Sequence, residues 1–285
     1  MWCIHMTRSL SNILLNNMRL YTHIAITILL LYASSCSKTA HQAPNRGSAY
    51  TNFNAFLDQP ANGIFGIQSY SSMIGQSGTR SCLIGGSFHD ASWNGLPGGP
   101  VSIGDIMMHD TAAGSSYQYG LTQPQPTTMY GSTVVFSINP NPDGDTTGAN
   151  ATASLYIPQL VSLSSPGLHD TISAGGHGIP ATVFSWNADP LDTTSVTLTF
   201  DYDPTNPLNT GLAASYPSKI VNVRTLHDKG SYVFQTSDAA DFPPNSWIDV
   251  TLTRPNYAKI HSADGTKTYL IFAFNAVQNT FYYSP

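Results

Sequence analysis

Four histidines in this chain are each followed directly by an aspartate. An imidazole beside a carboxylate can transfer protons, and both groups can bind a metal ion. Adjacent residues on a strand point to opposite faces, so these pairs would have to lie in loops to converge. We favour the simpler interpretation, in which each aspartate begins a turn by bonding its own backbone. The pairs are His89-Asp90, His109-Asp110, His169-Asp170 and His227-Asp228.

Two other groups of aspartates have spacings that chemistry could use. Asp143 and Asp145 lie in an Asn-rich segment and offer the hard oxygen ligands that calcium prefers, but their spacing completes no calcium loop. Asp201 and Asp203 share one face of an expected strand, where paired carboxylates could hydrolyse a glycoside. Carboxylates on a solvent-facing surface are more often simply hydrated. We therefore expect no metal site and no catalytic pair at these positions.

Motifs of the common enzyme classes are missing from the chain. It contains no glutamate, which rules out the His-Glu-x-x-His zinc motif, and it contains neither a P-loop nor paired Cys-x-x-Cys. The Gly-x-Ser-x-Gly nucleophile motif is also absent. The sequence thus predicts a protein that is not an enzyme and that needs no cofactor.

Two tryptophans are the best candidates for a ligand-binding surface. Trp93 lies in a Gly- and Pro-rich loop, and Trp247 falls on the polar face of an expected strand. An exposed indole can stack on the apolar face of a ligand, and the terminal residues 281–283, Phe-Tyr-Tyr, could extend that surface. The alternative is that Trp93 closes the end of the fold and that the tail forms a last strand.

The elements that would position these residues are strands. Alternating apolar and polar residues are separated by clusters of Gly, Pro, Asn and Asp, and no segment has a convincing helical period. In residues 195–203, Val, Leu, Phe and Tyr occupy one face, as in a half-buried antiparallel strand. The expected strands are 64–70, 81–88, 101–107, 132–138, 152–157, 182–186, 195–203, 219–225, 247–253 and 269–274.

This pattern predicts an all-β protein with one or two antiparallel β-sandwich domains. The most loop-like interior segment is 139–150, which suggests a boundary between an N-terminal β-rich domain, 49–150, and a second domain, 151–285.

The start of the chain has the layout of a secretory signal. Arg19 precedes the apolar residues 24–32, and the small residues Ala33, Ser34 and Ser35 lead to Cys36. This layout resembles the lipobox of bacterial lipoproteins, which implies cleavage of residues 1–35, acylation of Cys36 and attachment to the membrane through its lipid. Met18 is an alternative start, because residues 18–35 alone contain the whole layout. The polar residues 36–48 are expected to be a tether.

The chain that would follow the signal has few charges and a single further cysteine. Removing Arg8 and Arg19 with the signal leaves nine Lys and Arg against sixteen Asp, without a basic cluster, so nucleic-acid binding is not expected. Cys82 would be the only cysteine besides Cys36, which excludes an intramolecular disulfide framework. Stability must then come from an apolar core.

The segment from Asp228 to Phe234, Asp-Lys-Gly-Ser-Tyr-Val-Phe, resembles the Asp-x-Gly-x-Tyr-x-Cys segment of immunoglobulin domains. Phe234 stands where that family has its second cysteine. The resemblance implies that Tyr232 forms the corner before a core strand and that Trp186 is the core tryptophan of the third strand. It implies an immunoglobulin-like sandwich over 151–285, and it does not indicate a ligand.

A lipid anchor followed by sandwich domains resembles the surface lipoproteins of Bacteroidota. That resemblance implies an exported protein, anchored to the outer membrane or cell surface, with a non-catalytic role in binding or surface assembly. Two specific alternatives follow from it: a glycan-binding accessory protein, and a fimbrilin-like pilus subunit processed near Arg46. Its expected partners are the membrane, through Cys36, and a glycan or protein ligand.

Overall fold

The structure is a computed structural model of the 285-residue chain. It describes residues 53–72, 79–89, 94–95, 99–110, 116–118, 127–139, 150–176, 178–192 and 194–285. The expected signal peptide, 1–35, and the expected tether, 36–48, lie outside the described residues.

Nearly all regular structure in the described residues is β-strand, which confirms the all-β fold. One short helix and two 3-10 turns accompany the strands. The helix and turns are α2 (Phe53–Leu57), η2 (Thr127–Met129) and η3 (Pro207–Asn209). The strands are β1 (Gly63–Ser72), β2 (Thr79–Phe88), β3 (Val101–Ile103), β4 (Ile106–Asp110), β5 (Ser116–Gln118), β6 (Ser132–Ile138), β7 (Ala151–Ile157), β8 (Leu163–Ser165), β9 (Thr171–Ile172), β10 (Val183–Trp186), β11 (Ser195–Tyr202), β12 (Ile220–His227), β13 (Ser231–Val233), β14 (Ser246–His261) and β15 (Thr268–Tyr283).

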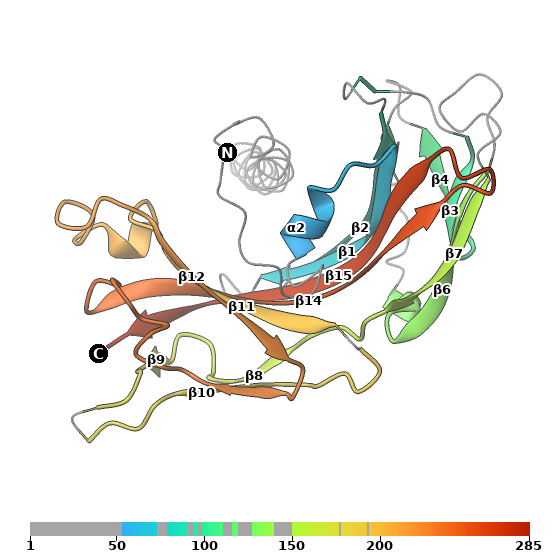
Figure 1. Ribbon diagram of the computed structural model, residues 1–285. Helices are drawn as coiled ribbons and strands as arrows, with labels where there is room; N and C mark the ends of the chain where they lie inside the picture. The colour runs from blue at the N-terminus through green and yellow to red at the C-terminus, as the bar shows by residue number, and fades with distance from the viewer. Residues whose placement is uncertain are drawn as a thin grey trace, which may run out of the picture. The chain divides into compact units, whose positions relative to one another are not determined.

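One large sheet contains twelve of these strands, in the order β12-β11-β14-β15-β1-β2-β5-β4-β3-β6-β7, with β9 pairing beside β15. Its strand pairs are antiparallel except that β1 and β9 each run parallel to β15. The 16-residue strands β14 and β15 form the long hairpin at its centre. In Figure 1, α2 lies on one side of this hairpin, and β8 and β10 lie on the other.

The alternation read from the sequence sets the two faces of the sheet. Buried and partly exposed residues alternate along the whole of β11, and the same pattern continues through the first half of β14. The apolar side chains of both strands therefore face one side, toward a core, while threonines and aspartates face the other. We call this second side, which carries Thr199, Asp201, Trp247 and Asp249, the outer face.

A second layer covers the opposite side of the hairpin. β13, β10 and β8 form a separate three-stranded sheet. Its central residue Phe184 packs against Phe200 and Phe281 of the large sheet, with 5.7 Å between ring centroids in each pair. Two sheets that bury a shared aromatic core between them are consistent with the expected β-sandwich.

The division near residue 150 does not match the arrangement of the strands. β6 and β7 lie on either side of it and pair along their whole length, from Ser132 with Ile157 to Ile138 with Ala151. Two apolar clusters do exist, but the β14–β15 hairpin contributes side chains to both. The loop-like composition of 139–150 therefore marks the connection between two paired strands and not a boundary between separate sheets.

The strand expected over 101–107 is instead a tight hairpin. β3 and β4 pair with Ile103 opposite Ile106, which leaves Gly104 and Asp105 as the turn. Gly104 has a φ of 57°, a conformation that glycine adopts without the steric cost of a Cβ. The apolar residues on both sides of this one glycine hid the turn in the sequence.

The immunoglobulin resemblance holds for burial but not for the tyrosine. Trp186 and Phe234 are both buried, and their strands are neighbours because β10 pairs with β13. The Tyr232 hydroxyl, however, donates to Asp238 Oδ2 at 2.7 Å, six residues further along the chain. In the tyrosine corner of immunoglobulin domains, the hydroxyl bonds the backbone upstream. Tyr232 therefore secures the following loop instead.

Candidate functional site

Several residues singled out in the sequence are not described by the structure. Cys36, Trp93, Asp143 and Asp145 lie outside the described residues, as do Asp90 and the side chains of His109 and Asp110. Within the described part of the chain, no three His, Cys or Asp side chains are grouped so that they could hold a metal ion.

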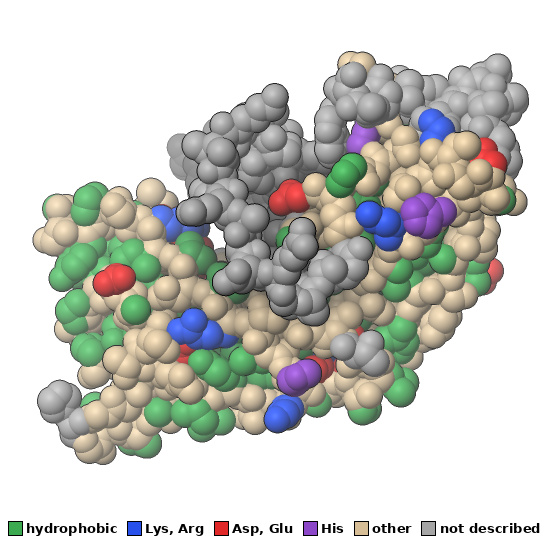
Figure 2. Space-filling model, viewed as in Figure 1, with side chains coloured by type: hydrophobic (Ala, Val, Ile, Leu, Met, Phe, Trp, Pro, Cys, Tyr) green, Lys and Arg blue, Asp and Glu red, His purple; other side chains and the backbone are tan. Residues whose placement is uncertain are grey.

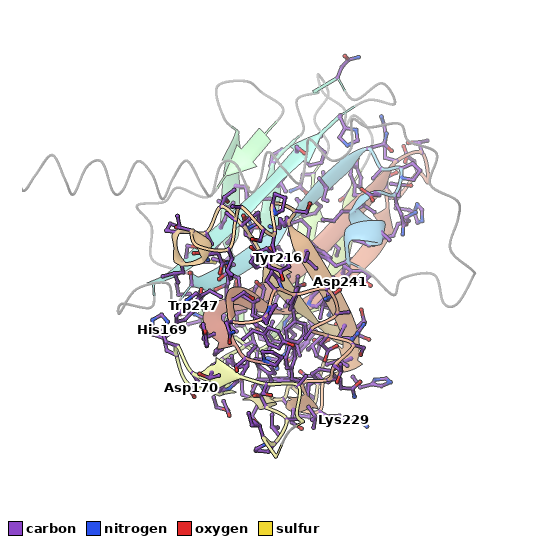
Figure 3. The ribbon with its side chains drawn as sticks, turned by 90° about the vertical axis from the view of Figure 1, so that its left-hand side faces the viewer. His169, Asp170, Tyr216, Lys229, Asp241 and Trp247 are labelled. Carbon is purple, nitrogen blue, oxygen red and sulfur yellow. The ribbon has the colours of Figure 1, made fainter. Side chains whose placement is uncertain are left out.

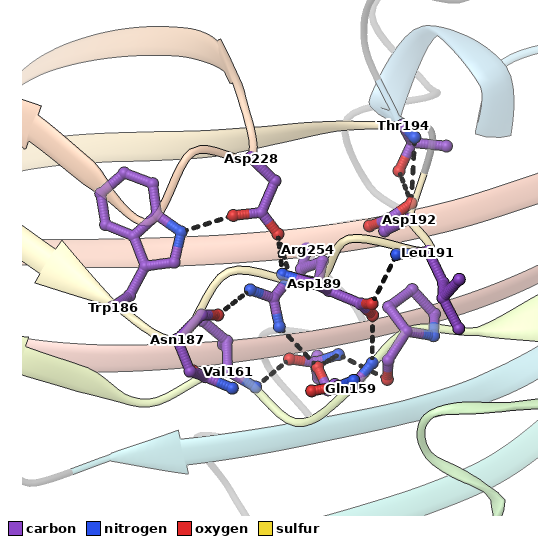
Figure 4. A network of polar contacts seen from close by, with 12 residues as sticks. Gln159, Val161, Trp186, Asn187, Asp189, Leu191, Asp192, Thr194, Asp228 and Arg254 are labelled. Atoms are coloured by element: carbon purple, nitrogen blue, oxygen red, sulfur yellow. Dashed lines mark hydrogen bonds and ion pairs between the residues drawn. The ribbon is translucent and has the colours of Figure 1, made fainter.

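Asp228, from the fourth His-Asp pair, belongs to a buried ion pair. Arg254 Nε donates to Asp228 Oδ2 at 2.8 Å, and both side chains are almost fully buried. Trp186 Nε1 donates to the other carboxylate oxygen at 2.7 Å. Figure 4 shows that Arg254 also reaches the carbonyl oxygens of Gln159 and Asn187. This carboxylate fastens two loops to β14 and has no solvent access for chemistry.

Asp201 and Asp203 also have protein partners. Lys219 Nζ lies 2.6 Å from Asp201 Oδ2 and 3.8 Å from Asp203 Oδ2. Asp201 directly faces Asp249 on β14, and Asp249 accepts a hydrogen bond from Thr280 on β15. Burial raises the pKa of Asp249, and the charge of Asp201 raises it further. Three carboxylates thus lie near one lysine in this part of the outer face.

Replacing Asp249 with asparagine should stabilise the protein at pH 7, by roughly 0.5 kcal/mol, because like charges directly opposite each other on a sheet are unfavourable. A carboxyl with a raised pKa binds its proton more tightly in the folded state, so acid favours folding at this position. The gain should therefore shrink as the pH falls through the raised pKa of Asp249. Urea unfolding at pH 7 and at pH 4 measures both effects.

Asp203→Asn is the matched control for Asp249→Asn. Hydrogen bonds from Thr205 lower the pKa of Asp203, so its ionised form stabilises the fold at neutral pH and this contribution is lost as acid protonates it. The two variants should shift stability at pH 7 in opposite directions. Equal destabilisation by both would contradict the assignment of Asp249 as an unfavourable buried charge.

Trp247 is the expected site residue around which other groups do converge. It lies on the outer face and is partly exposed, as predicted from the polar face of its strand. Its indole lies 5.4 Å from the Tyr282 ring, its cross-strand partner on β15, and 6.1 Å from the imidazole of His169. Figure 3 shows His169 and Trp247 side by side. We call His169, Trp247 and Tyr282 the Trp247 surface.

A buried amide fixes the backbone of Trp247. β11 pairs with β14 only as far as Asp201 and Asp249, so the strand leaves before it reaches Trp247. Asn209 takes its place: its Nδ2 donates to the Trp247 carbonyl at 2.8 Å, and its Oδ1 accepts from the Trp247 N–H at 2.8 Å. Asn209 is itself held at the end of η3. The indole therefore projects from a backbone that is bonded on both edges.

A tight turn brings His169 to the same place. The Asp170 N–H donates to the Gly167 carbonyl at 3.2 Å, and Asp170 Oδ2 accepts from the Gly167 N–H at 2.7 Å. The turn is joined to β15, because the Tyr282 N–H donates to the Asp170 carbonyl and Thr171 pairs with Tyr282. Three distant segments thus supply the three rings.

The surroundings of the Trp247 surface are apolar and exposed. The segment 207–223 at the same end of the domain exposes Leu208, Tyr216, Val221 and Val223. Hydrophobic side chains gather at this end, on the left of the view in Figure 2. The tail proposed to extend the surface does so only in part, since Tyr282 is partly exposed whereas Phe281 and Tyr283 are buried. Alternation along β15 explains this difference.

The rings of the Trp247 surface are placed where they could stack on a ligand. Exposed indole and phenol rings combine large apolar faces with polar edges, which suits ligands that have both characters. Sequence reasoning found Trp247 and included Tyr282 within the tail. It missed His169 as a neighbour and Asn209 as a support, because both depend on strand register and loop path.

Among the described residues, no helix is both long enough and apolar enough to cross a membrane. No protein-family model, curated protein sequence or solved structure matches the chain.

Proposed function

We propose that this protein is an exported lipoprotein, anchored through lipid on Cys36, that binds a glycan without catalysing a reaction. The observation that carries the binding proposal is the convergence of His169, Trp247 and Tyr282 on one exposed surface. The proposal of an anchor rests on the lipobox-like residues 33–36. Anchoring at an outer membrane or cell surface of a Bacteroidota-like bacterium belongs to the same proposal.

A glycan suits the Trp247 surface because a sugar ring has an apolar face and a rim of hydroxyl groups. Partly exposed aromatic rings can cover the apolar face of the sugar. The exposed carboxylate of Asp170 can accept hydrogen bonds from its hydroxyl groups. Three aspartates of the described residues support a non-catalytic role, because their buried carboxylates are bonded to groups that hold loops together: Asp189, Asp228 and Asp238.

The tether is long enough for such a role. Sixteen residues, 37–52, lie between Cys36 and Phe53, the first residue of α2. Fully extended, they would span at most about 60 Å. That reach would let the folded part contact polymers beyond the membrane surface to which it is attached.

Replacing Cys36 with alanine should release the protein from the membrane fraction and remove its labelling by a fatty-acid probe, because acylation of this sulfur is the proposed attachment. Cell fractionation with metabolic lipid labelling measures both results. Cys82→Ala is the matched control, since Cys82 is the other cysteine of the chain after the proposed cleavage. Lipid label that persists on the Cys36 variant would disprove the anchor.

The proposed function as a whole is tested by a ligand screen with the full chain in detergent, against immobilised polysaccharides and proteins. Retention by at least one polysaccharide is expected. Retention by protein ligands alone would replace the glycan proposal with a protein-binding one.

The pilus-subunit alternative has one structural feature in its favour, the position of β12 at the edge of the large sheet. An edge strand can pair with another chain. However, Lys219 precedes this strand and Arg224 lies within it, and charged side chains are a common protection of edges in monomeric proteins. The glycan-binding proposal therefore has the stronger support.

A further inference from the structure

The backbone of His169 has a conformation that L-residues rarely adopt. Its φ is 64°, and only two other non-glycine residues of the described chain have a positive φ, Asp241 and Asn245. In this left-handed region a Cβ lies too close to the neighbouring carbonyl, so glycine is the residue best suited to it. The Gly167–Asp170 turn would therefore form more easily with glycine at position 169.

Core packing does not account for a histidine there. His169 is exposed, and its ring meets Trp247 edge-on, with 80° between the two ring planes. The strained backbone of an exposed residue points to a functional role, because no packing of its side chain in a core requires that residue there. The imidazole is held in position by the turn, which two hydrogen bonds close and which β15 fixes.

The angles between the rings describe the shape of the Trp247 surface. The Trp247 and Tyr282 planes are inclined by 63°, and those of Trp247 and His169 by 80°. Rings at such steep angles meet edge to face and do not form a flat platform. Such a surface can contact one ring of a flexible chain, whereas a flat crystalline surface would touch only part of it.

We propose that His169 contacts the ligand and that the Trp247 surface takes a single uncharged sugar ring of a soluble polysaccharide. This inference rests on the proposed function and specifies the ligand class. Asp170 directly follows His169 and has an exposed carboxylate, which accepts hydrogen bonds from hydroxyls and repels acidic sugars.

The test uses the full-length protein in detergent and affinity electrophoresis through gels that contain hydroxyethyl cellulose, galactomannan or soluble starch. His169→Gly should unfold at the same temperature as the wild type or higher, because glycine relieves the backbone strain. Its dissociation constant should nevertheless be roughly threefold to tenfold higher, as expected for the loss of one aromatic contact. His169→Tyr, which keeps a ring, should retain most of the affinity.

Asp241→Gly is the matched control, because Asp241 is also exposed and has a φ of 65° but lies away from the Trp247 surface in Figure 3. The Asp241→Gly variant should lose the same kind of backbone strain and should bind the polysaccharide like the wild type. Loss of binding in Trp247→Ala together with unchanged binding in His169→Gly would overturn the role of His169 and leave the proposed function standing. Binding of the wild type to crystalline cellulose alone would overturn the assignment of a soluble polysaccharide as the ligand. Binding to no polysaccharide at all would overturn both proposals.

Discussion

Replacing Arg254 with methionine should lower the free energy of unfolding by about 3–5 kcal/mol, because one partner of a buried ion pair is removed and the other is left uncompensated. The side chain of Arg254 is wholly inaccessible to solvent, and that of Asp228 is 2% exposed. Methionine fills part of the volume but offers no donor. The loss would be a large share of the roughly 5–15 kcal/mol that stabilises a typical domain. Urea unfolding followed by circular dichroism measures it.

The expected cost is high because Arg254 bonds more than its ion-pair partner. It donates to the carbonyls of Gln159, in the loop between β7 and β8, and Asn187, in the loop after β10. A second buried side chain, Asn275 on β15, donates to the same Gln159 carbonyl at 3.0 Å and accepts from the Val161 N–H at 2.6 Å. Without Arg254, the Asn187 carbonyl and the Asp228 carboxylate would each lose a donor in a buried region.

A second substitution distinguishes charge from packing. Adding Asp228→Asn to Arg254→Met removes the uncompensated charge and keeps an acceptor for Trp186 Nε1. The double variant should therefore recover part of the lost stability. A loss below about 1 kcal/mol in Arg254→Met, or a double variant less stable than the single one, would show that the ion pair does not hold these loops.

The strands could be read from the sequence because their alternation is local. β6 was expected over 132–138 and has those bounds, and the segment 195–203 was expected to bury Val196, Leu198 and Phe200, which it does. Each side chain is directed by its own position in the pleat, so no knowledge of distant residues is needed. The β3–β4 hairpin was missed because its turn depends on the conformation of Gly104 alone.

Arg254 shows where the same signal was present but overlooked. It follows Ile248, Val250 and Leu252 at intervals of two, so alternation places it on the buried side of β14. A charged residue in that register predicts a buried partner. The identity of that partner could not be foreseen, since Asp228 is 26 residues away and meets Arg254 only because the loop after β12 packs against β14.

The position of Trp247 in the Trp247 surface could be predicted from the sequence, but its contacts with Tyr282 and His169 could not. The polar alternation of Asp249, Thr251 and Thr253 placed Trp247 on the outer face. Tyr282 joins it through the register of β14 with β15, and His169 through a turn that docks on β15. Both relations depend on contacts between residues at least 35 positions apart, which alternation does not encode.

Replacing Trp247 with alanine should reduce retention on a bound polysaccharide by about thirtyfold or more, because central aromatic residues carry most of the energy of a binding surface. The fold should be little affected. Trp247 is only partly buried, and the two hydrogen bonds from Asn209 involve its backbone, which alanine keeps. The thermal unfolding midpoint of the variant should therefore remain close to that of the wild type.

The most direct measurement compares the dissociation constants of the wild type, Trp247→Ala and Tyr216→Ala, as full chains, for one polysaccharide. Tyr216 is an aromatic residue at the same end of the domain, 38% exposed, and its backbone carbonyl, which accepts from the Tyr202 hydroxyl, is kept in the variant. We predict that Trp247→Ala loses binding and that Tyr216→Ala binds like the wild type. Equal affinity of the wild type and a folded Trp247→Ala would contradict the central claim that this surface binds the ligand.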